Sequence, residues 1–263
     1  MQDAQTGLML LTGGISVSNM RIRFIRGEAV KFISHLDLMK VFERAIRRSG
    51  LPISYSKGFN PHPHIIFGLP LAVGMTSECE HADLELDEEI KPEELVHMLN
   101  ASLPEGIRVT GAAVNHSRKN IMATICRADY ILEVYTEEAI PWEKAAGALK
   151  AILGSESVIV DRETRGKDGR TAVRETEIRP LIIDADIERI MTPPPGYEGF
   201  GSAFLIKTAL KAGSVANLNP GLLVKALENQ WGAVAAAVRM HRKAVYTDNG
   251  KGMADPMDTA SLS

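Results

Sequence analysis

The chain has 263 residues, of which 45% are hydrophobic and 24% are charged, and its formal net charge is −3. This composition is that of a globular protein with room for one large or two modest domains, and it excludes a chain that is basic throughout. No stretch approaches the roughly 18 apolar residues that a membrane-spanning helix needs. The two cysteines predict no disulfide framework, and we therefore expect a cytoplasmic location.

The two ends of the chain differ from the rest in composition. Residues 1–19 carry one acid and no Lys or Arg, which is not typical of a secretory signal. We expect a disordered extension there, with the folded unit starting at about Met20. Residues 247–263 are rich in Gly, Asp and Ser, and we expect a disordered tail.

The first half predicts a βαββαβ unit over residues 20–115. Apolar and polar residues alternate from Met20, which indicates a strand. Ser34 is a suitable N-cap for the following helix, Asp37 supplies a capping-box acid, and Gly50 ends the helix. The remaining predicted elements are strands at 64–71, 80–87 and 107–114 and a helix at 91–106.

The second half, residues 125–246, repeats this pattern with one extra strand. We therefore predict an α+β fold made of tandem ferredoxin-like domains joined near residues 116–124. The predicted elements are a strand at 128–136, a helix at 142–154, two strands within 157–187, a strand at 202–212, a helix at 219–231 and a strand at 237–246.

Basic residues gather on one face of the first predicted helix. Residues 21–64 hold nine basic and three acidic side chains, whereas residues 65–110 hold ten acidic and two basic ones. A positive face of this kind attracts polyanions such as RNA, although a helix face of this composition is equally often only solvated. The basic residues of the helix face are Lys40, Arg44, Arg47 and Arg48.

The loop that follows this helix, "YSKGFNPHPHIIF", carries more than turn residues. Tyr55, Lys57, Phe59 and His62 are suited to contact a nucleic-acid strand lying on the basic face, with the rings stacking on unpaired bases. The alternative is that the aromatic rings pack the loop onto the sheet.

Two further sets of residues suggest chemistry. His35, with Tyr55 and Lys57, is a candidate general acid or base for RNA cleavage. The other set, His62, His64, Cys79 and His81, stands in same-side pairs on predicted strands, but this spacing is not diagnostic of a metal. We predict no metal and no cofactor, because the chain also lacks a P-loop, a dinucleotide fingerprint and a cysteine cluster.

A second basic segment lies at residues 164–170, "TRGKDGR". Arg165, Lys167 and Arg170 stand at the tip of a predicted hairpin. They are either a second contact with a polyanion or a soluble turn.

Residues 32–78 resemble the signature of a radical-SAM-linked domain family of unknown function. The resemblance is strong over 20–86 and extends to about 245. It implies a protein fused to, or encoded beside, a cobalamin-type radical SAM protein, with ribonuclease E/G and ribosomal protein genes nearby. The matching positions are His35, Asp37, Arg44, Arg47, Arg48, Tyr55, Ser56, Gly58, Phe59, Pro61, His62, Pro63, Ser77 and Glu78.

The chain departs from this family at His64, where Lys or Arg is more usual, and it lacks the radical SAM cysteine cluster. It would therefore be the partner of such an enzyme. A weaker resemblance links the SHLD helix and the tandem plan to CRISPR-repeat-processing endoribonucleases, some of which cleave RNA with a histidine near the first helix. The glycine-rich loop of that group is not evident here.

Three functions follow from these observations. The first is an accessory RNA-binding protein that presents rRNA or tRNA to a separate radical SAM protein. The second is a metal-independent endoribonuclease that uses His35. The third is a protein–protein module whose acidic segment, residues 78–94, docks on a basic partner. The sequence does not indicate an oligomeric state.

Overall fold

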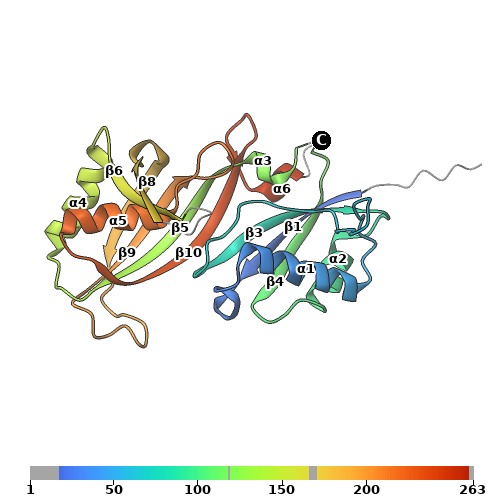
Figure 1. The fold of residues 1–263 in the computed structure, drawn as a ribbon, viewed down its shortest axis with the longest axis horizontal. Coiled ribbons are helices and arrows are strands. Elements are labelled where there is room, and N and C mark those ends of the chain that lie inside the picture. Colours follow the sequence, from blue (N-terminus) through green and yellow to red (C-terminus); the bar gives the residue numbers. More distant parts are fainter. Residues whose placement is uncertain (1–17, 118, 166–170, 261–263) are drawn as a thin grey trace, which may run out of the picture.

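The computed structural model describes residues 18–117, 119–165 and 171–260, so the predicted extension lies almost wholly outside the described residues. The elements of the first half alternate as predicted (Figure 1). They are β1 (Ser18–Arg26), η1 (Glu28–Val30), α1 (His35–Ser49), β2 (Ile65–Phe67), β3 (Met75–Leu86), α2 (Pro92–Asn100) and β4 (Ile107–Val114).

The second half carries one strand more than the sequence predicted. Residues 157–187 contain three strands, because the hairpin β6–β7 forms a separate two-stranded sheet and β8 follows it. The elements are α3 (Ile121–Thr124), β5 (Ile125–Thr136), α4 (Trp142–Gly154), β6 (Ile159–Arg165), β7 (Thr171–Glu177), η2 (Arg179–Leu181), β8 (Ile182–Arg189), β9 (Ser202–Lys211), α5 (Pro220–Trp231), β10 (Ala235–Asp248), β11 (Met253–Ala254) and α6 (Pro256–Ala260).

One large sheet runs through both halves. Its order is β4-β1-β3-β10-β5-β9-β8, with β2 added beside β3 and β11 beside β10. The halves meet where residues 240–242 of β10 pair in parallel with residues 75–77 of β3. The fold is thus a mixed α+β arrangement in which helices cover the sheet (Figure 1).

Helix α1 forms where the sequence predicted it. The Ser34 hydroxyl accepts the backbone N–H of Asp37, and Gly50 ends the helix in the left-handed region at φ 70°. The buried face packs on the sheet through Phe42, whose ring centroid lies 4.9 Å from that of Phe24 and 5.3 Å from that of Phe67. This packing fixes the opposite, charged face toward solvent.

A second core lies in the other half, between α4, α5 and the strands β5, β9 and β10. Trp231 at the end of α5 is buried against Phe204 of β9, with ring centroids 5.3 Å apart. The Asn219 side chain caps α5 by accepting the N–H of Gly221.

The tail differs from the prediction of disorder over 247–263. Residues 253–260 form β11 and α6, and α6 lies against β1 and β4. The segment folds back because charged side chains on the sheet face away from α1 require partners. The buried Arg21 side chain pairs with Asp83 at 2.7 Å and also donates to the Pro256 carbonyl, while Arg23 reaches Asp255 at 3.3 Å. The returning segment therefore covers charged groups that a sheet face alone would leave exposed.

Candidate functional site

The loop after α1 is a compact structure tied together by its own backbone. Tyr55 and Pro63 form an isolated bridge, and the N–H of Ser56 donates to the His62 carbonyl at 2.9 Å. The N–H of His62 returns a bond to the Ser56 hydroxyl at 3.0 Å. Gly58 turns the chain at φ 134°, a conformation that other residues rarely adopt. The loop thus holds its tip in a defined position.

The Tyr55 and Phe59 rings of this loop do not pack into the core, whereas Phe67 at its end does. Phe59 is fully exposed at the tip, Tyr55 is 41% exposed, and Lys57 is also exposed. Of the two interpretations of the loop, the structure therefore favours one in which the rings are available to a partner. An exposed phenylalanine beside a lysine is suited to stack on a flat group that carries negative charge.

The loop approaches α1 next to the basic residues. The His62 ring nitrogen lies 3.7 Å from the Glu43 carboxylate, and Arg47 stands one helical turn beyond Glu43. Arg44 and Arg47 are exposed, and neither has an ion-pair partner within the described part of the chain. The loop tip and these two guanidinium groups therefore belong to one surface, which we call the α1–loop surface: Arg44, Arg47, Lys57, Phe59 and His62.

The two other basic residues of α1 are occupied. The Lys40 ammonium pairs with Asp37 at 3.5 Å. The Arg48 guanidinium donates to the Ser102 carbonyl at 2.5 Å, which directs it toward the end of α2. The described contacts thus leave Arg44 and Arg47 as the two basic residues of α1 without an intramolecular partner, while Lys40 stays exposed beside Asp37.

Much of the charge separation seen in the sequence is neutralised within the fold. The acids of β3 face bases from neighbouring strands and loops, and this leaves fewer charges on segment 78–94 than the sequence suggests. The pairs are Glu78 with Lys243 and His241, Glu80 with Arg242, Asp83 with Arg21, and Glu85 with His64.

His35 lies at the start of α1 but is separate from the loop residues with which it was grouped. Its ring packs edge-on against Phe67, with centroids 5.6 Å apart. Burial, and then the positive charge of Arg26, lower the pKa of His35, so its imidazole is neutral at pH 7. Its described contacts do not include Tyr55 or Lys57, so the structure does not assemble the three into one catalytic group.

The residues considered for a metal site are also dispersed. His62 faces Glu43, His64 faces Glu85 at 3.2 Å, and His81 lies 3.7 Å from Asp255. Burial raises the pKa of the Cys79 thiol to about 12. Within the described ranges, no group of three or more His, Cys, Asp or Glu side chains is placed to hold a metal ion.

Most of the second basic segment falls outside the described residues. Lys167 and Arg170 fall outside the described residues, and Arg165 is the last residue of β6. Figure 1 shows β6 and α1 toward opposite ends of the long axis.

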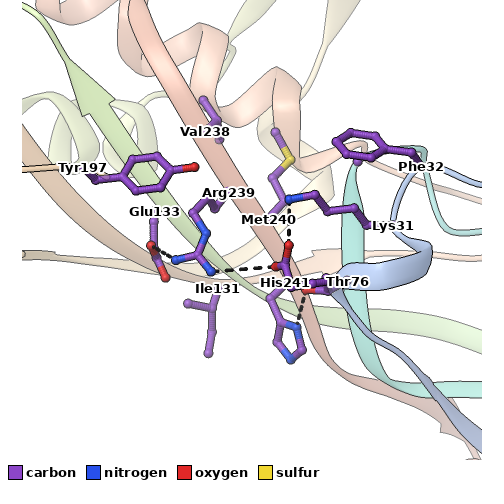
Figure 2. A pocket seen from close by; sticks show the side chains of 12 residues that line it. Lys31, Phe32, Thr76, Ile131, Glu133, Tyr197, Val238, Arg239, Met240 and His241 are labelled. Atoms are coloured by element: carbon purple, nitrogen blue, oxygen red, sulfur yellow. Dashed lines mark hydrogen bonds and ion pairs between the residues drawn. The ribbon is translucent and has the colours of Figure 1, made fainter. Parts of the chain in front are cut away.

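Sequence reasoning missed a cavity of about 290 Å³ at the junction of the two halves (Figure 2). Arg239 lines this cavity, with its guanidinium 2.7 Å from the Glu133 carboxylate and 3.8 Å from that of Glu28. The Lys31 ammonium pairs with Glu28 at 2.7 Å, and the Tyr197 ring lies under Arg239. Its walls come from segments near residues 30, 75, 132, 197 and 240, and no local sequence pattern signals such a combination.

The fold and its exposed surface define a mixed α+β protein with a basic, aromatic surface beside its first helix and a cavity between its halves. The described residues include no helix long and apolar enough to cross a membrane. A family of uncharacterized proteins conserved in bacteria (DUF2344) matches residues 19–220, and the chain belongs to this family.

Other comparisons are distant. No curated protein matches the chain. A chain in the crystal structure of a Cbf5–Nop10–Gar1 complex is 11% identical with a TM-score of 0.42, and the match covers 87% of this chain and 48% of that one. A chain of a manganese-bound DypB variant is 10% identical with a TM-score of 0.19, over 94% and 96% of the two chains. Both TM-scores are too low to support an argument.

Proposed function

We propose that the protein is an accessory RNA-binding protein that presents rRNA or tRNA to a separate radical SAM enzyme. The observation that carries the RNA-binding part is the fully exposed Phe59 ring, held beside Arg44 and Arg47 on a loop that its own hydrogen bonds fix. Exposing a phenylalanine to water is unfavourable, so a surface that does so beside free cations is suited to a ligand that covers it.

The chemistry of this surface fits unpaired RNA better than a duplex. Phe59 offers a face on which a base can stack, worth about 1–3 kcal/mol per base in known single-strand binders. Arg44, Arg47 and Lys57 offer charge to the phosphates, which supply most sequence-independent affinity. A duplex hides its base faces, whereas loops and ends of rRNA or tRNA present them.

The radical SAM partner rests on the family resemblance of residues 32–78. The chain has two cysteines, in different strands, rather than the clustered cysteines of a radical SAM centre. The covalent chemistry would therefore belong to the partner enzyme, and this chain would supply RNA affinity. The proposal includes a cytoplasmic location, where both thiols stay reduced.

We further propose that both halves are ferredoxin-like units. The strand order β4-β1-β3-β2 in the first half has its equivalent in β10-β5-β9-β8 in the second, with two helices packed on each. The same order in both halves supports a tandem plan in which the hairpin β6–β7 is an insertion.

The proposal is tested by measuring RNA binding and RNA integrity together. Purified protein is mixed with total cellular RNA, with and without a chelator, at low and moderate salt. Salt-sensitive binding without cleavage is the expected result. Chelator-resistant cleavage that disappears in His35→Ala would instead identify the endoribonuclease suggested by the weaker CRISPR resemblance. The absence of both binding and cleavage would overturn the RNA proposal and favour a protein-docking module.

A further inference from the structure

Strand β10 has an edge that the sheet leaves open. Residues 240–242 pair with β3, but the five preceding residues, 235–239, pair only with β5, with a one-residue register shift at Ala236. Within the described ranges, no strand pairs with the side of residues 235–239 that faces away from β5. At about 3.3 Å per residue, this open edge is roughly 17 Å long.

The chain bends away from this edge just before β3 begins. The N–H of Gly74 donates to the Lys31 carbonyl at 2.8 Å, so the segment before Met75 follows η1 instead of β10. The space that a longer β3 would fill is the cavity of about 290 Å³. Val238, Arg239 and Met240 lie on its β10 side, and Lys31 and Phe32 lie opposite (Figure 2).

Apart from Arg239, the open edge lacks the charged side chains that usually protect such edges. Residues 235–238 are Ala, Ala, Ala and Val. By contrast, β8 at the end of the sheet exposes Asp184, Asp186 and Glu188. Charged residues on an edge strand prevent pairing with other chains. Charged side chains protect β8 from pairing with other chains, whereas most of the open edge of β10 has none. This difference indicates that pairing at β10 is tolerated.

The charges around the cavity compensate one another. Lys31 pairs with Glu28, and Arg239 lies between Glu28 and Glu133. The His241 ring is engaged by the Thr76 hydroxyl at 2.8 Å. An occupant therefore meets no unbalanced charge, but it meets Phe32, whose side chain is 73% exposed. This balance favours an uncharged, apolar segment.

We propose that the open edge of β10 binds an extended, uncharged segment of a partner protein by strand addition. The segment would pair with backbone groups of residues 236–239, because the Ala235 N–H already donates to the Glu228 carboxylate at 2.8 Å, and it would place an apolar side chain against Phe32. This site goes beyond the proposed RNA function and is independent of it, because it shares no residue with the α1–loop surface.

The test uses the full chain and a displayed library of random dodecapeptides. Selected peptides are synthesised, their affinity is measured by calorimetry, and the amides that they protect are located by hydrogen exchange. We expect enrichment of sequences with alternating β-branched or aromatic residues and no net charge. Protection is expected within residues 235–240.

The matched variants are Phe32→Lys and Leu36→Lys. Both remove an exposed apolar side chain, 73% and 67% exposed, and add one charge, but only Phe32 lines the cavity. Phe32→Lys is expected to weaken the selected peptide at least tenfold, and Leu36→Lys less than twofold, with unchanged melting temperatures. No enrichment, equal binding by both variants, or protection confined to other residues would overturn the proposal. Phe32→Ala repeats the test without adding charge.

Discussion

Replacing Glu80 by Gln is expected to destabilise the whole chain, because Glu80 joins its two halves. The Arg242 side chain of β10 is 3% exposed, and its Nη1 lies 2.9 Å from the Glu80 carboxylate of β3. Arg242 also donates to the Tyr130 hydroxyl and to the carbonyls of Leu69 and Pro70. The Arg242 guanidinium is thus held within one buried site by acceptors from both halves of the chain.

The expected loss of unfolding free energy follows from the buried Arg242 charge that Glu80→Gln leaves without its carboxylate partner. Burial alone would lower the pKa of Arg242, but Glu80 and Tyr130 outweigh it and raise that pKa, so the guanidinium stays charged. Removing one charge of a buried pair costs about 3–5 kcal/mol of unfolding free energy. Because the Gln amide oxygen still accepts a hydrogen bond, we expect a loss of about 3 kcal/mol.

The assay is urea denaturation followed by circular dichroism, with Lys243→Gln as the matched control. Lys243 is the next residue along β10 and pairs with Glu78 at 2.5 Å, but its side chain is solvent-exposed. We expect no measurable change for this variant. Equal midpoints for the wild type and Glu80→Gln would refute the reasoning that this buried pair couples the halves.

Three further predictions concern single groups. The pKa of His35 is lower in the folded state, so the stability that the neutral His35 contributes is present above the unfolded pKa and is lost as the pH falls below it. In thermal melts, His35→Gln should therefore lose less stability than the wild type between pH 7 and pH 5. An identical pH profile for the two proteins would contradict this. Burial raises the pKa of the Cys79 thiol to about 12. When the folded protein is alkylated at pH 8, mass spectrometry should therefore find the label on Cys126 alone. Early labelling of Cys79 would count against this prediction. Deleting residues 249–263 removes the Pro256 carbonyl from Arg21 and should lower the unfolding free energy by about 1–3 kcal/mol, whereas unchanged stability would show that α6 is dispensable.

Local signals in the sequence predicted local structure well. Ser34 starts a helix and Gly50 ends it as expected, and the helix predicted over 219–231 forms with Asn219 as its N-cap. The period-two pattern located β1, because Met20, Ile22 and Phe24 all belong to the core of the first half. These features depend on residues within one turn or one strand, which the sequence displays directly.

Long-range pairing was not predictable in the same way. The parallel contact of β3 with β10 joins residues about 165 positions apart, and the order of the tail depends on Arg21 and Arg23 needing partners. Composition alone made residues 247–263 look disordered. The candidate site was foreseen in part: the loop and α1 were identified, but the loss of Lys40 and Arg48 to intramolecular contacts depends on geometry.

The central claim is that the α1–loop surface binds RNA through phosphate contacts and base stacking. The most direct test measures the affinity for a single-stranded RNA at several salt concentrations. The variant set combines Arg44→Gln, Arg47→Gln and Lys57→Gln, and its control combines the same change at three exposed cations of the second half: Lys150, Arg174 and Lys211.

Each phosphate contact contributes about −0.7 to the slope of log affinity against log salt for single strands, so three contacts contribute about −2. The account predicts that the triple variant loses this part of the slope, while the control triple keeps it, and that Phe59→Ala weakens binding at every salt concentration without changing the slope. The same slope and affinity in both triple variants, or no RNA binding by the wild type, would contradict it.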